Sequence, residues 1–175
     1  MTRELVGPLA EHFRTRADSP EGEAAAEAHF FHAFMRNKLG ARLHHQGARA
    51  RGPRLVAAGL PGECTETALL LFCLEATAYD YRIVLLGGDM PLRPIPHVAR
   101  RTDARGIFLF GEGDHAADIE ESLQELVAAA PCPVAVAGAV AAQRRPAVER
   151  AGAHALPEAA SAGIGAIRNL LRSGC

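Results

Sequence analysis

Short apolar runs alternate with helix-forming segments from residue 54 to residue 171, and this alternation constrains the fold more than any other feature. The apolar runs have the length and composition of buried strands and lie at 54–59, 81–86, 106–110, 132–137 and 153–156. Helical segments follow them at 65–78, 92–102, 116–129, 145–151 and 158–171. Because helices supply the right-handed crossovers between parallel strands, we expect both faces of a parallel sheet to be covered. The pattern predicts a flavodoxin-like doubly wound α/β domain with a five-stranded sheet of order 2-1-3-4-5.

Two further helical patterns precede this domain. Residues 1–17 would place Leu5, Val6, Leu9 and Phe13 on one helix face. After a break at 18–22, a second helix is predicted from Glu23 to His45. Its apolar stripe consists of Phe30, Phe31, Phe34, Met35, Leu39 and Leu43. A basic linker at 47–53 follows, so we predict a short helical segment, 1–48, and an α/β domain, 53–175.

The composition disfavours several classes of protein. A net charge of −1 supplies no strong field to attract nucleic acid. The first residues lack the apolar core of a signal peptide, and no stretch has the length and apolarity needed to cross a bilayer. The four cysteines form no Cys-x-x-Cys pair, which favours free thiols. We expect a cytoplasmic protein that contacts neither nucleic acid nor membrane directly.

The loops after the strands are where doubly wound folds bind ligands. Here they are 60–66, 87–91, 111–115 and 138–143. A phosphorylation receiver would need acidic residues after strand 1, where this chain has Leu60. A flavodoxin would bind a phosphate there, and Glu63 and Glu66 would repel it. The dinucleotide motif Gly-x-Gly-x-x-Gly is also absent from this loop.

Glu63 and Glu66 admit two interpretations. As a pair of carboxylates they are suited to acid–base chemistry. Alternatively, they stabilise the N-terminus of the following helix, with Cys64 or Thr65 as its cap. No nucleophile or oxyanion donor accompanies the pair, which favours the second interpretation.

Two motifs resemble one known family. Gly59-Leu60-Pro61-Gly62-Glu63-Cys64-Thr65-Glu66 and Leu85-Leu86-Gly87-Gly88-Asp89-Met90-Pro91 resemble the cobalamin-binding domain of light-dependent MerR-type repressors. Upstream, Glu27-Ala28-His29-Phe30 resembles the end of the helical bundle that covers the upper face of cobalamin in that family. The resemblance implies a cofactor site at the strand ends. The candidate cofactor-binding residues there are Glu63, Thr65, Gly87, Gly111 and Gly138.

The chain departs from that family at the positions that matter most. The family's lower axial histidine falls at Thr65, a poor cobalt ligand. The serine that lets the nucleotide tail pass strand 3 falls at Phe110, whose ring would fill the slot. The first glycine of a pair on strand 4 falls at Ala137. These differences argue against a standard cobalamin site.

A second group of relatives suits these losses. The photosynthesis antirepressors of purple bacteria resemble this fold and lack the lower-ligand motif. Their likeness implies cobalamin or heme held by a histidine from another side, and a transcription regulator as partner. His29, which lies among Ala25, Phe30 and Phe31, and His12 are the predicted metal ligands. His32 is expected to be solvated.

The leading hypothesis is a regulatory domain without enzymatic activity. It would bind a tetrapyrrole, cobalamin or heme, and signal to a transcription regulator through movement of residues 1–45. One alternative is a degenerate domain without cofactor that acts as an interaction or dimerisation module, for instance as a homodimer. The other is a corrinoid carrier subunit of a methyltransferase, against which Thr65 counts.

Overall fold

The computed structural model describes residues 22–63, 66–112, 119–157 and 160–173, together with residues 8, 9 and 12. Of the helix predicted at 1–17, residues 8, 9 and 12 are helical, and the other positions lie outside the described residues. Thr65 and Cys64 lie outside them as well. None of the described helices combines the length and apolar character that a membrane span requires.

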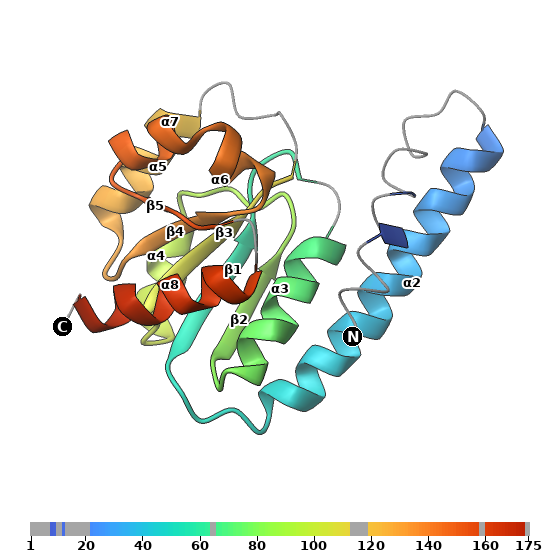
Figure 1. Ribbon diagram of the computed structural model, residues 1–175, viewed down its shortest axis with the longest axis horizontal. Helices are drawn as coiled ribbons and strands as arrows, with labels where there is room; N and C mark the ends of the chain where they lie inside the picture. The colour runs from blue at the N-terminus through green and yellow to red at the C-terminus, as the bar shows by residue number, and fades with distance from the viewer. Residues whose placement is uncertain are drawn as a thin grey trace.

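A five-stranded parallel sheet forms the centre of the molecule (Figure 1). The strands are β1 (Arg54–Gly59), β2 (Arg82–Gly87), β3 (Gly106–Phe110), β4 (Val134–Ala137) and β5 (His154–Ala155). Their order is β2-β1-β3-β4-β5, and all neighbouring pairs are parallel. Gly59 pairs with Phe110, and Phe110 pairs with Ala137, so these three strands end at one edge. The predicted fold class and strand order are confirmed.

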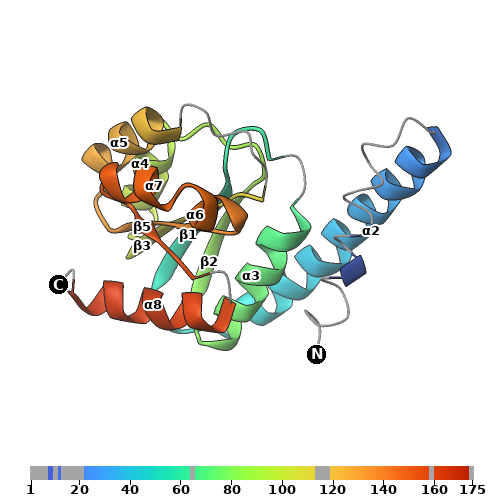
Figure 2. The same cartoon turned by 45° about the horizontal axis from the view of Figure 1, so that its top comes forward.

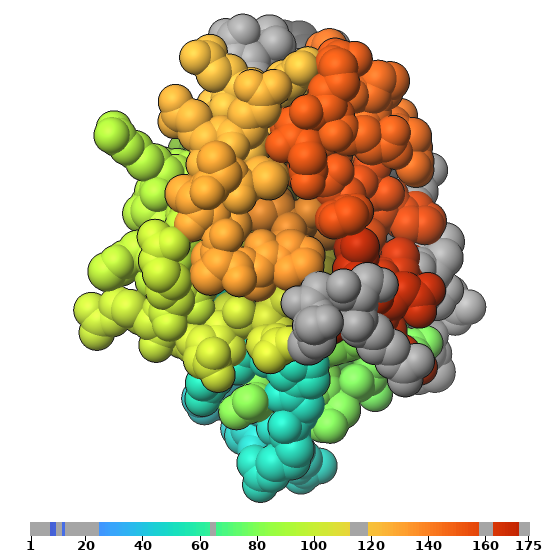
Figure 3. All heavy atoms as spheres, turned by 90° about the vertical axis from the view of Figure 1, so that its left-hand side faces the viewer, coloured from blue at the N-terminus to red at the C-terminus, as the bar shows by residue number. Residues whose placement is uncertain are grey.

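Helices cover both faces of the sheet, as Figures 1 and 2 show. On one face lie α2 (Gly22–Gly47), α3 (Thr67–Ala78) and α8 (Ala160–Ser173). On the other lie α4 (Ile95–Arg101), α5 (Ile119–Ala129), α6 (Ala139–Gln143) and α7 (Arg145–Arg150), the side seen in Figure 3. The helix α6 corrects the sequence prediction, which had a loop at 138–143.

Side chains alternate between two cores along each strand. Ala57, Phe108 and Ala135 point toward α3 and α8, whereas their neighbours Val56 and Ile107 point toward α4 and α5. This alternation follows from the period of two residues in a strand. Because β1, β3 and β4 are buried on both faces, these strands read as continuous apolar runs in the sequence.

Helix α2 packs along α3 and is the outermost element on that side (Figures 1 and 2). Leu39 and Leu43 are buried in the core shared with α3, and Ala28 is buried as well. Phe30 and Phe34 are not, with 73% and 47% of their surface exposed. The predicted single apolar stripe is therefore wrong, because the apolar residues of α2 lie on two different faces.

Candidate functional site

Carboxylates join the loops at the carboxyl edge of the sheet. Glu63 Oε1 accepts a hydrogen bond from the backbone N–H of Glu112 at 2.8 Å. Glu66 Oε1 accepts one from the N–H of Gly88 at 2.7 Å, and Asp89 Oδ1 one from the N–H of Gly62 at 2.8 Å. The loop after β1 is thus fastened to the loops after β2 and β3.

These bonds give Glu63 and Glu66 a structural role that the sequence did not predict. Glu63 is buried, and its carboxylate bonds to a neighbouring loop. The N-cap of α3 is Glu66, and its side chain makes no capping bond. The prediction of a cap at Cys64 or Thr65 is therefore wrong, although both residues themselves lie outside the described residues.

The three glycines predicted to contact a cofactor contact the chain itself. A Cβ atom at Gly138 would lie 2.4 Å from the carbonyl oxygen of Gly111. One at Gly111 would lie 2.7 Å from Leu60 Cδ1, and one at Gly87 2.8 Å from Glu66 Oε1. Gly138 also has a φ of +87°, a conformation that favours glycine. Backbone conformation thus favours glycine at Gly138 and at Gly87, whose φ is +94°, whereas Gly111 lies in tight contact with the side chains of Leu60 and Val140.

Phe110 fills the space between the sheet and α3. Its ring is buried, and its centroid lies 6.2 Å from that of Phe72, which lies 5.9 Å from that of Phe108. A Cβ at Gly138 would lie 3.2 Å from Phe110 Cζ, so the ring reaches the turn after β4. Ala137 is buried in the same core. Phe110 is thus a core residue between the sheet and α3, and its role toward a nucleotide tail stays a prediction.

The two predicted metal ligands lie in exposed positions. His29 is exposed on α2, and His12 is exposed and helical. Among the described residues, no three histidine, cysteine, aspartate or glutamate side chains are grouped closely enough to hold a metal ion. A metal bound here would therefore take few protein ligands from this part of the chain.

His32 is the histidine that the structure places against the start of α3. Its Nδ1 lies 3.4 Å from Thr67 Oγ1, at the first residue of α3. Its Nε2 is buried and has no hydrogen-bond partner among the described residues. Burial lowers the pKa of His32 below its usual 6.5, and nearby His29 lowers this pKa further. The expectation that His32 is solvated is therefore wrong.

A signal for His32 was present in the sequence. It lies four residues after buried Ala28 and seven before buried Leu39, on the α2 face that packs on α3. The predicted apolar stripe instead included Phe30, which lies on the opposite face of α2. Toward its N-terminus, α2 continues past the start of α3 (Figure 1), so His29 lies about one helical turn beyond His32.

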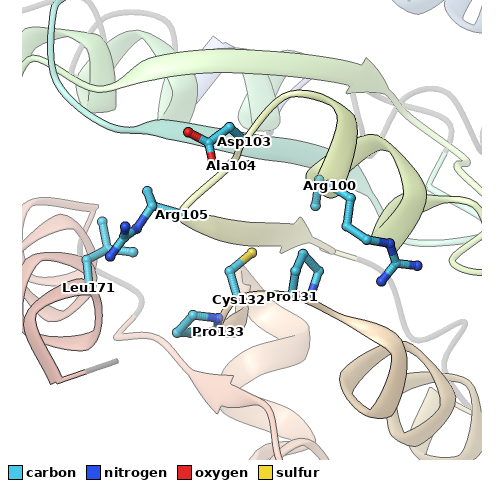
Figure 4. A pocket seen from close by; sticks show the side chains of 9 residues that line it. Arg100, Asp103, Ala104, Arg105, Pro131, Cys132, Pro133 and Leu171 are labelled. Atoms are coloured by element: carbon cyan, nitrogen blue, oxygen red, sulfur yellow. The ribbon is translucent and has the colours of Figure 1, made fainter. Parts of the chain in front are cut away.

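A cavity of about 570 Å³ lies at the opposite edge of the sheet. Figure 4 shows Arg105, Cys132 and Pro133 around it, close to where β3 and β4 begin. Burial raises the pKa of the Cys132 thiol, and Arg105 partly opposes this rise. The cavity is at the amino edge, away from the loops where ligands of doubly wound folds bind.

Comparison with known proteins gives likeness at the level of the fold. No family model and no curated protein sequence matches the chain. A novel cobalamin-binding protein from Desulfitobacterium hafniense DCB-2 superposes with a TM-score of 0.58 and 17% identity, over 96% of this chain and 92% of that one.

Two structures from Methanosarcina barkeri are also similar. The methanol:cobalamin methyltransferase complex MtaBC has a TM-score of 0.57 and 14% identity, over 69% of this chain and 46% of that one. The monomethylamine corrinoid protein has a TM-score of 0.58 and 17% identity, over 85% and 68%. This chain therefore has the fold of cobalamin-binding proteins.

Proposed function

We propose that the protein is a cobalamin-responsive regulatory domain without enzymatic activity. The corrinoid would bind between α2 and the carboxyl edge of the sheet, with its nucleotide tail outside the core. The observation that carries this proposal is the buried, unpartnered Nε2 of His32, beside the start of α3. The fold shared with cobalamin-binding proteins supports cobalamin over heme, which none of these relatives is named for.

The chemistry of His32 suits an axial ligand. A neutral imidazole is the form that binds a metal, and a lowered pKa favours that form. A buried polar atom without a partner costs about 1–3 kcal/mol. In the packed arrangement of α2 on α3, Nε2 of His32 lacks a hydrogen-bond partner. A bond from this atom to a metal would remove the cost. A bound corrinoid would supply the metal centre.

The nucleotide tail does not suit the space beneath α3. Phe72, Phe108 and Phe110 occupy it with buried rings. A tail could enter only after these rings moved, which would expose apolar surface and break close packing. The proposed mode of binding therefore leaves the tail in solvent.

Movement of α2 would convert binding into a signal. Because Nε2 of His32 is buried and α2 packs on α3, we expect that this atom reaches a ligand only if α2 shifts on α3. The loops at the edge are fastened by Glu63 and Glu66, so α2 is the element free to respond. Ligand would favour the shifted position over the packed one. A transcription regulator that recognises one position is the partner we propose.

Visible spectra after gel filtration test this proposal. The full chain is mixed separately with hydroxocobalamin, with tail-less cobinamide and with hemin. We expect both corrinoids to co-elute with similar affinity and hemin to elute apart. His32→Ala should abolish the shifted corrin band. His44→Ala, an exposed histidine near the far end of α2, is the matched control and should leave the band unchanged.

The outcomes separate the alternatives. If His29→Ala loses the shifted corrin band and His32→Ala keeps it, the metal ligand is His29, as predicted from the sequence. Strong preference for cobalamin over cobinamide would contradict an excluded tail. If neither corrinoid co-elutes, the proposal fails.

A module without cofactor is the second candidate. It is favoured by the buried ring of Phe110, which packs in the core, and by the backbone contact and positive φ that favour glycine at Gly138 without a cofactor. Absence of any co-eluting chromophore would support it. The carrier of a methyltransferase stays a third candidate, since two of the similar structures are named as corrinoid proteins of that kind. Methyl transfer by the loaded protein would support that candidate.

A further inference from the structure

Helix α2 has a second apolar face that the described residues leave uncovered. Each residue of an α-helix turns about 100° from the last. Phe30 and Phe34 therefore lie nearly opposite His32, whose side packs on α3. Their rings stack with centroids 6.3 Å apart, and they are exposed. Exposed Ala26, Ala33 and Ala41 extend this face along the helix, and exposed Asn37 is the polar residue that lies on it.

The charges of α2 are divided between its two halves. Glu27 lies in the N-terminal half, and Arg36, Lys38 and Arg42 lie in the C-terminal half. Lys38 Nζ is 5.5 Å from the centroid of the Phe34 ring, so it borders the uncovered face. Helical geometry places Glu27 on the same border as Lys38. The two ends of the face thus differ in sign.

We propose that this face binds the same face of a second copy, with the two α2 helices antiparallel. The two-fold axis would cross α2 at the level of residue 32, on the side of the helix that carries Phe30 and Phe34. It brings Phe30 of one copy next to Phe34 of the other. The same axis brings Glu27 of one copy next to Lys38 of the other. One symmetry operation thus places both the aromatic and the charged groups opposite each other, as a two-fold interface requires.

A parallel pair or an unrelated partner would not use these features together. Parallel helices would set Lys38 beside Lys38 and Glu27 beside Glu27. The antiparallel pair also opposes the two helix dipoles. At 26 residues, α2 is about 39 Å long, enough for several turns of contact on each side of the axis. The inference is independent of any cofactor.

Charge reversal tests the arrangement in the full, cofactor-free chain. Light scattering coupled to gel filtration should give twice the mass of one chain. Phe30→Glu should give the mass of one chain. Glu27→Lys and Lys38→Glu, each alone, should raise the Kd of the dimer about tenfold, because like charges then meet. The double variant should recover most of the affinity.

Recovery in the double variant is specific to pairing between copies. Glu27 and Lys38 are about 17 Å apart along one helix, too far to pair within it. Glu125→Lys on α5, also exposed, is the matched control and should leave the Kd unchanged. Circular dichroism checks that each variant folds. A single-chain mass for the unaltered protein at its highest attainable concentration overturns the proposal, as does a double variant no tighter than the single ones.

Discussion

Glu66 accepts a hydrogen bond from the backbone N–H of Gly88 at 2.7 Å, and so holds the start of α3 against the loop after β2. The bond is close because Gly88 has no side chain: a Cβ there would lie 2.8 Å from the carbonyl oxygen of Glu63. The position of one loop at the carboxyl edge therefore depends on a carboxylate from another.

Removing this carboxylate should loosen the edge. Glu66→Ala leaves the amide of Gly88 without its acceptor, and we expect the free energy of unfolding to fall by about 1–3 kcal/mol. Glu66→Gln keeps an acceptor oxygen and should lose less. Urea unfolding measures the difference, and hydrogen exchange at Gly88 should quicken in the alanine variant. Unchanged hydrogen exchange at Gly88 would show that Glu66 does not hold this loop in place.

Gly138→Ala should destabilise the domain by more than about 1 kcal/mol, because a positive φ and the Gly111 carbonyl both disfavour a Cβ there. Gly165→Ala is the opposite case. It lies exposed in α8 with nothing near its Cβ position, and should stabilise by about 0.5–1 kcal/mol. Thermal and urea unfolding measure both. Equal effects at the two positions would show that the loop contact is unimportant.

Phe110→Ala should lower the free energy of unfolding by about 3–5 kcal/mol, as expected for a large ring removed from a packed core. Phe110→Leu fills more of the space and should cost less. Both are measured by urea unfolding. A loss below about 1 kcal/mol for the alanine variant would mean that the ring is not part of the packed core.

The apo protein should lose stability in mild acid through His32. Its pKa is lowered on folding, so the unfolded chain binds the proton more readily. Its contribution is complete above the usual pKa of 6.5 and declines as the pH falls below that value. Urea unfolding from about pH 8 to about pH 5 should show this slope. His32→Leu should flatten it, and His44→Ala should not. If the free energy of unfolding of His32→Leu falls with pH as steeply as that of the unaltered protein, other titrating groups cause the loss of stability.

Cys73 should be inert in the native state. It is fully buried, and burial raises its pKa to about 12. Thiolate is the reactive form, so alkylation should be slow until the protein unfolds. Peptide mass spectrometry after timed alkylation should find Cys132, which is half-buried, modified before Cys73. Labelling of Cys73 at the rate of an unfolded thiol would contradict its burial.

The sheet could be predicted from sequence because both its faces are buried. Such strands are uninterrupted apolar runs, and the helices between them allow few topologies. Helix α6 was missed because five residues after Gly138 are too few to show a helical period. The ends of β4 and β5 differ from the prediction by one or two residues, where pairing with a neighbour decides the boundary.

The candidate site was harder to predict than the fold. The sequence identified the loops, but it could not show that Gly111 and Gly138 face each other, because that contact joins different strands. On α2, the exposed residues Phe30 and Phe34 are as apolar as the buried Leu39 and Leu43. The sequence alone therefore did not show which face of α2 is buried, and His32 was predicted to face solvent. Burial on a helix depends on which neighbour it packs against, and α3 supplies that information only in three dimensions.

The packed rings of Phe72, Phe108 and Phe110 have a consequence for how the protein behaves in a cell. A domain whose core is complete without a ligand folds, and survives proteolysis, whether or not that ligand is supplied. Under the proposed function, scarcity of the cofactor would change the position of α2 on α3 without unfolding the domain. Survival of the fold would then depend on the packed rings, and the position of α2 on the proposed ligand.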